Sequence, residues 1–213
     1  NYIDKYEYLL PELTLDKNLF SSNKMGILDI QTNFKSHLYD INKKTDFLIN
    51  DFNWDMKSIY YNSGIKSKLF SKIKNVNYET NNVNEYKSDT TSEIFGAIGY
   101  LSEFDLFKKS KNLTTHQITR KIMLRYAPEH MRKEDGSDKL NSLNLFTLNR
   151  INNTNNFEGG LSSTLGFDYE LDKNDKKFKL SLGQVINAKE NKNMPTSSSL
   201  DEKLSDVIGS STL

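Results

Sequence analysis

The stretch FEGGLSSTLGFDYEL (residues 157–171) alternates between apolar and polar positions along its whole length. One side carries the larger apolar residues Phe157, Leu161, Leu165, Phe167, Tyr169 and Leu171. The other side carries the polar residues Glu158, Ser162, Thr164, Asp168 and Glu170. Because successive side chains of a β-strand point to opposite faces, this pattern predicts one strand with an apolar wall and a wet wall. The apolar wall faces either a protein core or lipid.

The same period-two alternation recurs along the chain, whereas helical periodicity is scarce. It predicts further strands at 28–39, 48–60, 65–74, 93–107, 115–127 and 178–183. Polar connections are predicted at 75–92, 108–114, 128–141, 152–156 and 187–203. Their lengths alternate loosely between short and long, as in hairpins with tight turns at one rim and extended loops at the other. We therefore expect an all-β, antiparallel fold of about ten strands.

The length of these strands bears on the choice between a soluble sandwich and a membrane barrel. Several alternations persist over 11 to 15 residues, whereas strands of soluble proteins average about 5–6 residues. Strands of about 9–11 residues cross a bilayer at a tilt. Aromatic residues near predicted strand ends, as in the interfacial girdles of membrane barrels, are Tyr60, Tyr100, Tyr126, Phe157, Phe167 and Tyr169. Length and aromatic placement favour the barrel, and the sandwich remains the alternative.

Composition narrows the function further. The chain has 213 residues, a net charge of +1 and no cysteine, so disulfides and thiolate sites are excluded and no overall field attracts nucleic acid. It contains no apolar run of about 18 residues, which excludes a transmembrane helix. The absence of a signal peptide and of an initiator Met suggests an internal piece. We expect residues 1–213 to be part of one outer-membrane β-barrel domain, truncated at both ends.

Candidate chemistry is sparse. His37, His116 and His130 are isolated, and neither a metal-ligand spacing nor a catalytic motif accompanies them. We therefore assign no catalytic, cofactor-binding or metal residues, and expect that the protein is not an enzyme. A row of basic residues lies on one strand face, at Lys66, Lys68, Lys72 and Lys74. The row is either a solvated face or a lumenal patch that meets a phosphorylated, anionic ligand.

From residue 119 onward the motifs become specific. The segments TRKIMLRYAPE, SDKLNSLNLFTLNR, FEGGLSSTLGFDYEL, LSLGQVI and LSDVIG follow one another in order. This series resembles the C-terminal barrel region of the outer-membrane LPS-assembly protein LptD (organic solvent tolerance protein) family. The matching positions are Asn144, Leu145, Phe146, Asn149, Arg150, Gly159, Gly183, Gln184, Ser205 and Asp206. YEYLLPELTL (residues 6–15) resembles an upstream strand of the family. Two departures are Arg120, where the family has Pro, and INNTNN, which replaces a Gly-x-Asp-Arg motif.

The resemblance implies part of an antiparallel, up-and-down transmembrane β-barrel in the outer membrane of a Gram-negative bacterium. Its function would be the insertion of lipopolysaccharide (LPS) into the outer leaflet, without bond-making chemistry. The implied partners are LPS, a plug lipoprotein of the LptE type, the periplasmic LPS-transport bridge and outer-membrane lipid. The alternatives are another outer-membrane barrel, such as a porin or siderophore receptor, and a soluble β-sandwich that binds carbohydrate.

The two strand faces then acquire expected roles. We expect the apolar residues Leu28, Phe34, Trp54, Leu161, Leu165 and Phe167 to face lipid. We expect Asp29 and Lys35 to face the lumen. The further candidates to face the lumen are Lys66, Lys68, Lys72, Lys74, Glu158, Ser162, Asp168 and Glu170. Because Gly160, Ser162 and Gly166 are small, the sequence predicts lumenal room beside them for a plug or a passing lipid.

Overall fold

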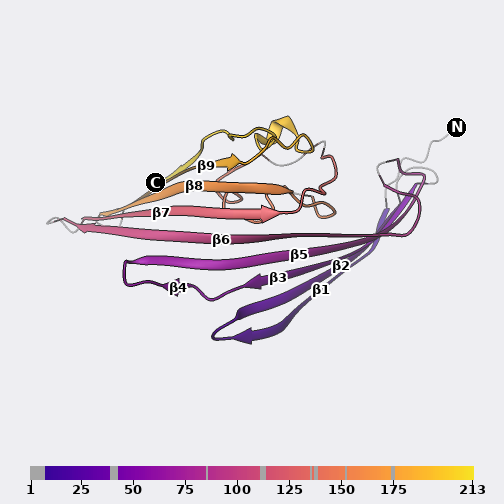
Figure 1. The fold of residues 1–213 in the computed structure, drawn as a ribbon, viewed down its shortest axis with the longest axis horizontal. Coiled ribbons are helices and arrows are strands. Elements are labelled where there is room, and N and C mark those ends of the chain that lie inside the picture. The colour runs from indigo at the N-terminus through magenta and orange to yellow at the C-terminus, as the bar shows by residue number, and fades with distance from the viewer. Residues whose placement is uncertain are drawn as a thin grey trace.

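The computed structural model describes residues 8–38, 43–84, 86–110, 114–134, 136, 139–151, 153–173 and 176–213. These residues form one antiparallel sheet of ten strands, in the order β1-β2-β3-β5-β6-β7-β8-β9-β10, with β4 beside β5. The strands, seen in Figure 1, are β1 (Tyr8–Ser22), β2 (Gly26–Leu38), β3 (Lys44–Asp55), β4 (Ile59–Tyr60), β5 (Ile65–Asn81), β6 (Thr91–Lys109), β7 (Thr114–Ala127), β8 (Gly160–Lys173), β9 (Lys176–Asn187) and β10 (Ile208–Thr212). A 3-10 turn, η1 (Thr196–Ser198), precedes β10. The predicted all-β, antiparallel fold is confirmed.

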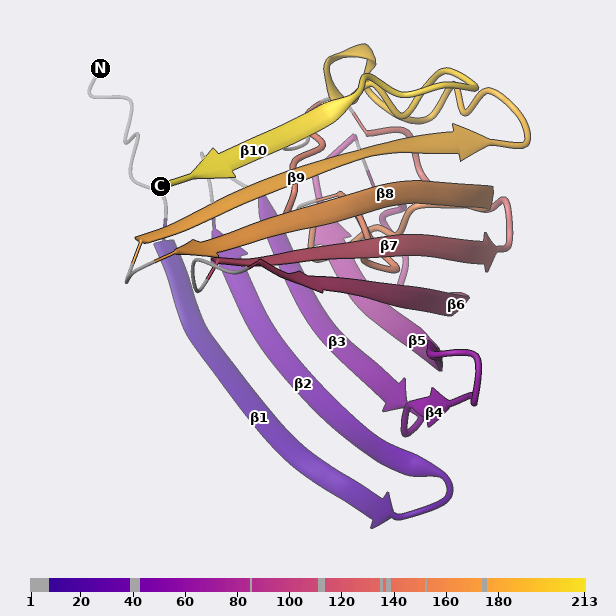
Figure 2. The ribbon, with the colours of Figure 1, turned by 90° about the vertical axis from the view of Figure 1, so that its left-hand side faces the viewer.

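Consecutive strands lie next to each other, which is the up-and-down order that the sequence predicts. The sheet curves and stays open, with β1 and β10 as its edges (Figure 2). A sandwich would require two sheets packed face to face. The described residues contain one sheet only, so the fold is that of a partial barrel wall.

The connections differ in length between the two rims, as predicted. At one rim, called the short-turn rim here, lie the connections 23–25 and 56–64 and the paired strand ends of the β6–β7 and β8–β9 hairpins. Gly26 ends the first of these turns with φ +80°, and a Cβ there would lie 1.9 Å from the Asp55 carbonyl oxygen. The opposite rim carries two long connections, the β7–β8 connection (128–159) and the β9–β10 connection (188–207).

Three predicted boundaries are wrong. The strand predicted at 48–60 ends at Asp55, and Tyr60 belongs to the separate β4. Residues 75–81 belong to β5 rather than to a connection, because their side chains continue the alternation and bury Val76 and Tyr78. The strand predicted at 157–171 begins only at Gly160, whose φ of +105° interrupts the extended backbone. Phe157 therefore leaves the predicted apolar wall and is 2% exposed in the core.

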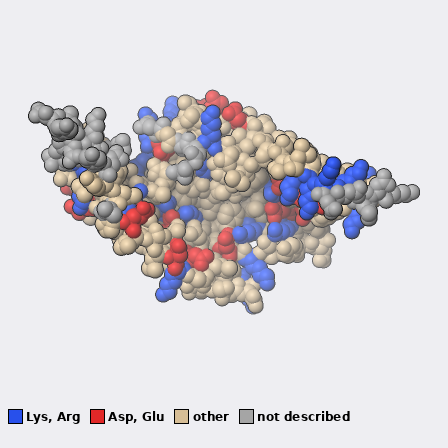
Figure 3. Space-filling model, turned by 180° about the vertical axis from the view of Figure 1, so that it is seen from behind, with Lys and Arg blue, Asp and Glu red and all other residues tan. Residues whose placement is uncertain are grey.

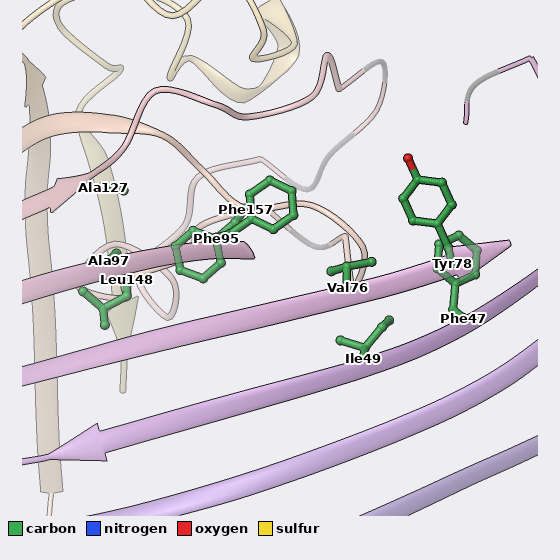
Figure 4. Close-up of a cluster of buried hydrophobic side chains, with 9 residues drawn as sticks. All are labelled: Phe47, Ile49, Val76, Tyr78, Phe95, Ala97, Ala127, Leu148 and Phe157. Carbon is green, nitrogen blue, oxygen red and sulfur yellow. The ribbon is translucent and has the colours of Figure 1, made fainter. Parts of the chain in front are cut away.

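The core lies between one face of the sheet, called the inner face here, and the two long connections. One cluster joins Leu148 and Phe157 of the β7–β8 connection to β3, β5, β6 and the end of β7 (Figure 4). A second cluster joins both connections over Val185 of β9. The connections also bond to each other, since the Glu134 backbone N–H donates to the Asn193 carbonyl at 2.8 Å. Thus the long connections fold back onto the sheet instead of extending from the rim.

The helical structure in the described residues is the short 3-10 turn η1. Among the residues described, none of the helices is long and apolar enough to cross a membrane.

Candidate functional site

The face opposite the inner face, called the outer face here, is an exposed apolar surface. Strand register places Ile98, Tyr126 and Leu161 in one row across β6, β7 and β8, and Ile122 next to Leu165. Large apolar side chains exposed by 43–55% on this face are Ile98, Ile122, Leu124, Tyr126, Leu161 and Leu165. A contiguous apolar surface of this kind marks contact with lipid or a partner in native proteins.

The residues expected to face lipid all lie on this outer face. Leu28 is directly opposite Trp54, and Phe34 is opposite Leu48. Leu161, Leu165 and Phe167 follow at alternate positions of β8 and are 52%, 43% and 38% exposed.

The aromatic residues that were predicted to form interfacial girdles divide into two groups. Tyr126 and Tyr169 lie within a few residues of the strand ends and face outward. Tyr100 and Phe167 lie near the middle of β6 and β8, Phe157 lies in the core, and Tyr60 lies opposite Lys66 on the inner side. The girdle assignment of these four residues is therefore wrong.

The outer face carries polar groups that bond among themselves. The Thr32 hydroxyl donates to Asn50 Oδ1 at 2.8 Å, and Asn50 Nδ2 donates to Asn75 Oδ1 at 3.4 Å. Arg120 also lies on this face, between Phe104 and Phe167 of the neighbouring strands. Hydrogen bonding between strands lowers the cost of Thr32, Asn50 and Asn75 on an otherwise apolar wall.

The basic row of β5 lies on the inner face, with each ammonium group close to a carboxylate. The pairs, at Nζ–O distances of 2.9, 2.7, 3.3 and 2.8 Å, are Lys66–Glu103, Lys68–Asp55, Lys72–Asp51 and Lys74–Asp51. Because neighbouring strands already supply these carboxylates, the arrangement favours a solvated, compensated wall over a free patch for an anionic ligand.

Asp168 and Glu170 also lie on the inner face and continue this pattern of alternating charge. Asp168 pairs with Lys121 at 2.5 Å, and Glu170 pairs with Lys179 at 2.7 Å. All four side chains are partly exposed. The inner face near the short-turn rim is therefore charged, self-compensated and accessible to water.

Farther from that rim, the β7–β8 connection covers the inner face and reaches across the sheet. Lys74 Nζ donates to the Thr154 carbonyl at 2.9 Å, and Lys35 Nζ of β2 donates to the Thr154 hydroxyl at 3.1 Å. The connection thus spans from β8 to β2 and is held at its tip by two lysines.

Arg132 holds the same connection in an aromatic box. Its guanidinium lies 5.6, 5.2 and 5.7 Å from the ring centroids of Tyr78, Tyr86 and Phe95. It also bonds the Glu93 carboxylate and the Asn155 carbonyl. Such cation–π contacts each stabilise by about 0.5–2 kcal/mol, with the larger values where water is excluded.

A third set of contacts, which also holds the β7–β8 connection on the sheet, is a buried ion cluster of Arg125, Arg150 and Glu158. Both guanidiniums are 0% exposed and the Glu158 side chain is 4% exposed. Arg150 Nε donates to Glu158 Oε2 at 2.8 Å, and the same guanidinium bonds Oε1. Arg125 Nε donates to the Leu148 carbonyl at 2.6 Å and lies on β7. The cluster therefore fixes the C-terminal part of the connection, from Leu148 to Glu158, to β7 and β8.

Glu158 is ionised in this setting. Burial alone would raise the pKa of its carboxyl, but the charges of Arg125 and Arg150 and the hydrogen bonds from Arg150 hold the pKa below its usual value. The three groups together carry one net positive charge, which a neutral Glu158 would increase.

The room predicted beside the small residues of β8 is occupied by the chain itself. Arg150 donates to the Ser162 hydroxyl at 3.0 Å, and Ser162 is buried. A Cβ at Gly166 would lie 2.9 Å from Cζ of Phe146. The prediction of free space for a plug or a lipid is therefore wrong at Ser162 and Gly166, because the β7–β8 connection fills it. Beside Gly160 the space is open, since a Cβ there would meet nothing within 4 Å and a pocket of about 490 Å³ adjoins it.

An unfilled hollow lies elsewhere on the inner face, beside β1, β2 and β3. It has a volume of about 940 Å³ and is lined in part by Glu12, Lys35, Phe47, Tyr86 and Asn155. Polar and aromatic groups are mixed around it.

Sequence reasoning missed the role of the two buried arginines. Arg125 falls on the wet side of its predicted strand, and Arg150 enters the sequence comparison only as a matching position. A detectable signal was the presence of Arg125 near the end of a predicted strand and of Arg150 and Glu158 in the connection that follows it. The sequence pattern could not reveal that the connection folds inward.

Comparison with protein families gives one match. The model of LptD, described as LPS transport system D, matches residues 71–213. The matched part extends from β5 to the end of the chain and includes both long connections and all three residues of the buried cluster. A search of curated proteins finds no match to the chain.

Proposed function

The chain belongs to the LptD family of LPS transport proteins, and we propose that its sheet is a section of an outer-membrane β-barrel that inserts LPS into the outer leaflet. The observation that carries this proposal is the family match, which covers more than half of the chain. The exposed apolar outer face and the charged inner face support it, because a membrane barrel needs a wall of this kind.

The two rims support an orientation in the membrane. Outer-membrane barrels have short periplasmic turns and longer extracellular loops. On this basis the short-turn rim faces the periplasm, and the β7–β8 and β9–β10 connections enter the barrel from the outside. LPS would then pass a lumen that this chain already narrows on the side of β6 to β9.

The proposed partners are LPS, a plug lipoprotein of the LptE type, the periplasmic LPS-transport bridge and outer-membrane lipid. The self-filled wall of β7 to β9 leaves the hollow beside β1 to β3 as the better place for the plug. Lys35, Glu12 and Tyr86 offer it charge, hydrogen bonds and an aromatic surface. This role requires binding and guidance of a lipid, without bond-making chemistry.

Depletion of the full-length protein in its source bacterium tests the function. We expect LPS at the cell surface to fall and LPS to accumulate on the periplasmic side, with recovery when the wild-type gene is supplied. Unchanged surface LPS on depletion would contradict LPS insertion and favour the alternative of a porin or receptor barrel.

Photo-crosslinking tests the position of the plug. A crosslinker at Glu12 of the full-length protein should capture the plug lipoprotein, whereas one at Ser162 should react within the chain because Arg150 lies on it. Capture of the plug from Ser162 but not from Glu12 would contradict the placement.

A further inference from the structure

The outer face ends at the short-turn rim of β6 to β9 in a belt of aromatic side chains. His116 Nδ1 lies 2.9 Å from the Tyr169 hydroxyl, and their ring centroids are 6.1 Å apart. The Tyr169 and Phe178 rings follow at 6.3 Å in an edge-to-face arrangement. Aromatic rings with polar atoms gather at the boundary between hydrocarbon and headgroups in membrane proteins. The belt marks where the apolar wall ends.

Three lysines border this belt on the same face. Lys108 lies opposite His116 in the strand register, and Lys173 lies opposite Lys176 one row farther out. All three side chains are exposed. Figure 3 shows the blue side chains gathered at this end of the molecule, on the right beside the grey residues. The order from the middle of the outer face outward is therefore apolar, aromatic, then cationic.

These lysines differ from their neighbours in having no carboxylate partner. Within the described parts of the chain, the structure gives no ion pair to Lys108, Lys173 or Lys176. Lys177 and Lys179, at alternate positions on the inner face, pair with Asp172 at 3.7 Å and with Glu170 at 2.7 Å. Among the described residues, the lysines on the outward side of the rim therefore carry positive charge that the ion pairs of the inner face do not compensate.

A groove of about 700 Å³ at this rim combines the two chemistries that an amphiphile requires. Leu171 and Phe178 line it with apolar surface, and Lys173 and Lys176 line it with positive charge. We propose that this lysine rim binds the phosphate of an anionic phospholipid, of the phosphatidylglycerol class, in the periplasmic leaflet. The groove lies at the edge of the sheet, where Lys177 and Lys179 of the inner face also line it. The acyl chains would extend from Leu171 and Phe178 onto the apolar outer face. This inference rests on the membrane position and orientation given under the proposed function.

The charge pattern selects an anionic over a zwitterionic lipid. A zwitterionic headgroup carries a compensating cation that lysines repel, whereas each Lys near an anionic surface contributes about 1 kcal/mol of attraction. Phosphates of LPS share the same chemistry, but in the proposed orientation they accumulate at the opposite rim.

The test uses the full-length protein in mixed micelles with phosphatidylglycerol or phosphatidylcholine, and native mass spectrometry to count retained lipids. The wild type should retain phosphatidylglycerol preferentially. The variant Lys108→Gln/Lys173→Gln/Lys176→Gln should lower that preference by at least about tenfold. The matched control Lys139→Gln/Lys189→Gln/Lys192→Gln removes the same charge from the opposite rim and should keep the preference.

Three outcomes would overturn the proposal: equal retention of both lipids by the wild type, the same loss in the control variant, or displacement of phosphatidylglycerol by an equal amount of LPS. If the triple variant does not fold, as judged by heat-dependent migration on gels, the lipid preference of the wild type at different salt concentrations still tests the proposal. This preference must fall as salt rises, because salt screens exposed charges. Surface LPS after depletion is measured separately, so a failed lipid preference is distinguishable from a failed function.

Discussion

Two sets of ion pairs on the same inner wall differ in their surroundings. In the buried cluster, the side chains of Arg150 and Glu158 are 0% and 4% exposed beneath the β7–β8 connection. In the basic row of β5, Lys66 and Glu103 are 38% and 18% exposed. The chemistry of the paired groups is alike, whereas their access to water is not.

This difference in exposure indicates which ion pairs hold the β7–β8 connection in place. A charge that is removed from water depends on its partner, so the loss of one buried partner costs about 3–5 kcal/mol. An exposed pair contributes about 0–1 kcal/mol because water and salt solvate either group alone. The buried cluster can therefore hold the connection in one position, and the exposed pairs of the lysine row mainly keep the wall hydrated. Lys74 is the buried member of the row and holds the connection as well.

The largest effect is expected from Glu158→Gln. This variant keeps the shape of the side chain but leaves Arg125 and Arg150 buried without a carboxylate. We expect a loss of about 3–5 kcal/mol in the docking of the β7–β8 connection. Limited proteolysis of the full-length protein in detergent measures it as faster cleavage within 139–151.

Glu170→Gln is the matched control, because it removes a carboxylate from an exposed pair on the same wall. It should leave the cleavage rate unchanged. Equal rates in the two variants would show that burial does not distinguish the two sets of pairs.

The next effect tests the apolar part of the outer face. Leu165→Arg places a cation near the middle of β8 and should cost about 2–4 kcal/mol in a membrane barrel. Unfolding by urea in lipid vesicles measures this cost. Gln117→Arg adds the same charge to the inner wall opposite Glu170 and should be tolerated, and a reversed order would contradict the assignment of the faces.

A smaller effect is expected where the connection packs against the sheet. A Cβ at Gly183 would lie 2.4 Å from Cδ2 of Leu145 and 3.0 Å from the Leu165 carbonyl. Gly183→Ala should therefore cost about 1–3 kcal/mol through overpacking, again seen as faster proteolysis of the connection. Gly136→Ala is the control, since a Cβ at Gly136 meets nothing within 4 Å, and it should have no effect.

Acid should loosen the buried cluster in the unmodified chain. Because the folded pKa of Glu158 is below its usual 4.5, the cluster has its full stability above pH 4.5 and loses it as pH falls through the lowered pKa. A spin label at Leu143→Cys, which is 89% exposed in the wild type, should become more mobile in that range. In Glu158→Gln the label should be mobile at every pH, and a remaining acid transition there would contradict this cause.

The sheet was predictable because alternation over many residues has one physical explanation. Period two alone separated Leu161, Leu165 and Phe167 from the polar residues of their strand, and Lys66 to Lys74 from the apolar residues of theirs, and the strand register has the same two faces. The extension of β5 to Asn81 was missed because polar residues such as Asn75 and Asn77 interrupt its outer side. Phe157 was misplaced because the alternation of apolar and polar residues continues through Gly159 and Gly160 in the sequence. The backbone nevertheless turns at Gly160, so Phe157 is not part of the strand.

The site was less predictable than the sheet. Which groups fill the lumen depends on contacts between segments far apart in sequence, such as Thr154 with Lys35 and Phe146 with Gly166. Local pattern carries no information about such contacts. The family resemblance supplied the function but gave Arg150 only as a matching position, so its burial against Glu158 emerged from the structure alone.

The smallest effect is expected from Lys66→Gln, in the exposed row. The variant removes one partner of the 2.9 Å pair with Glu103, yet both groups remain accessible to water. We expect at most about 1 kcal/mol of destabilisation in urea unfolding, and less at high salt. Lys74→Gln is the sharper comparison, because Lys74 is buried and also holds Thr154, so it should loosen the connection measurably. If Lys66→Gln loosened the connection as much as Lys74→Gln, the burial of an ion pair would not determine whether it holds the connection in place.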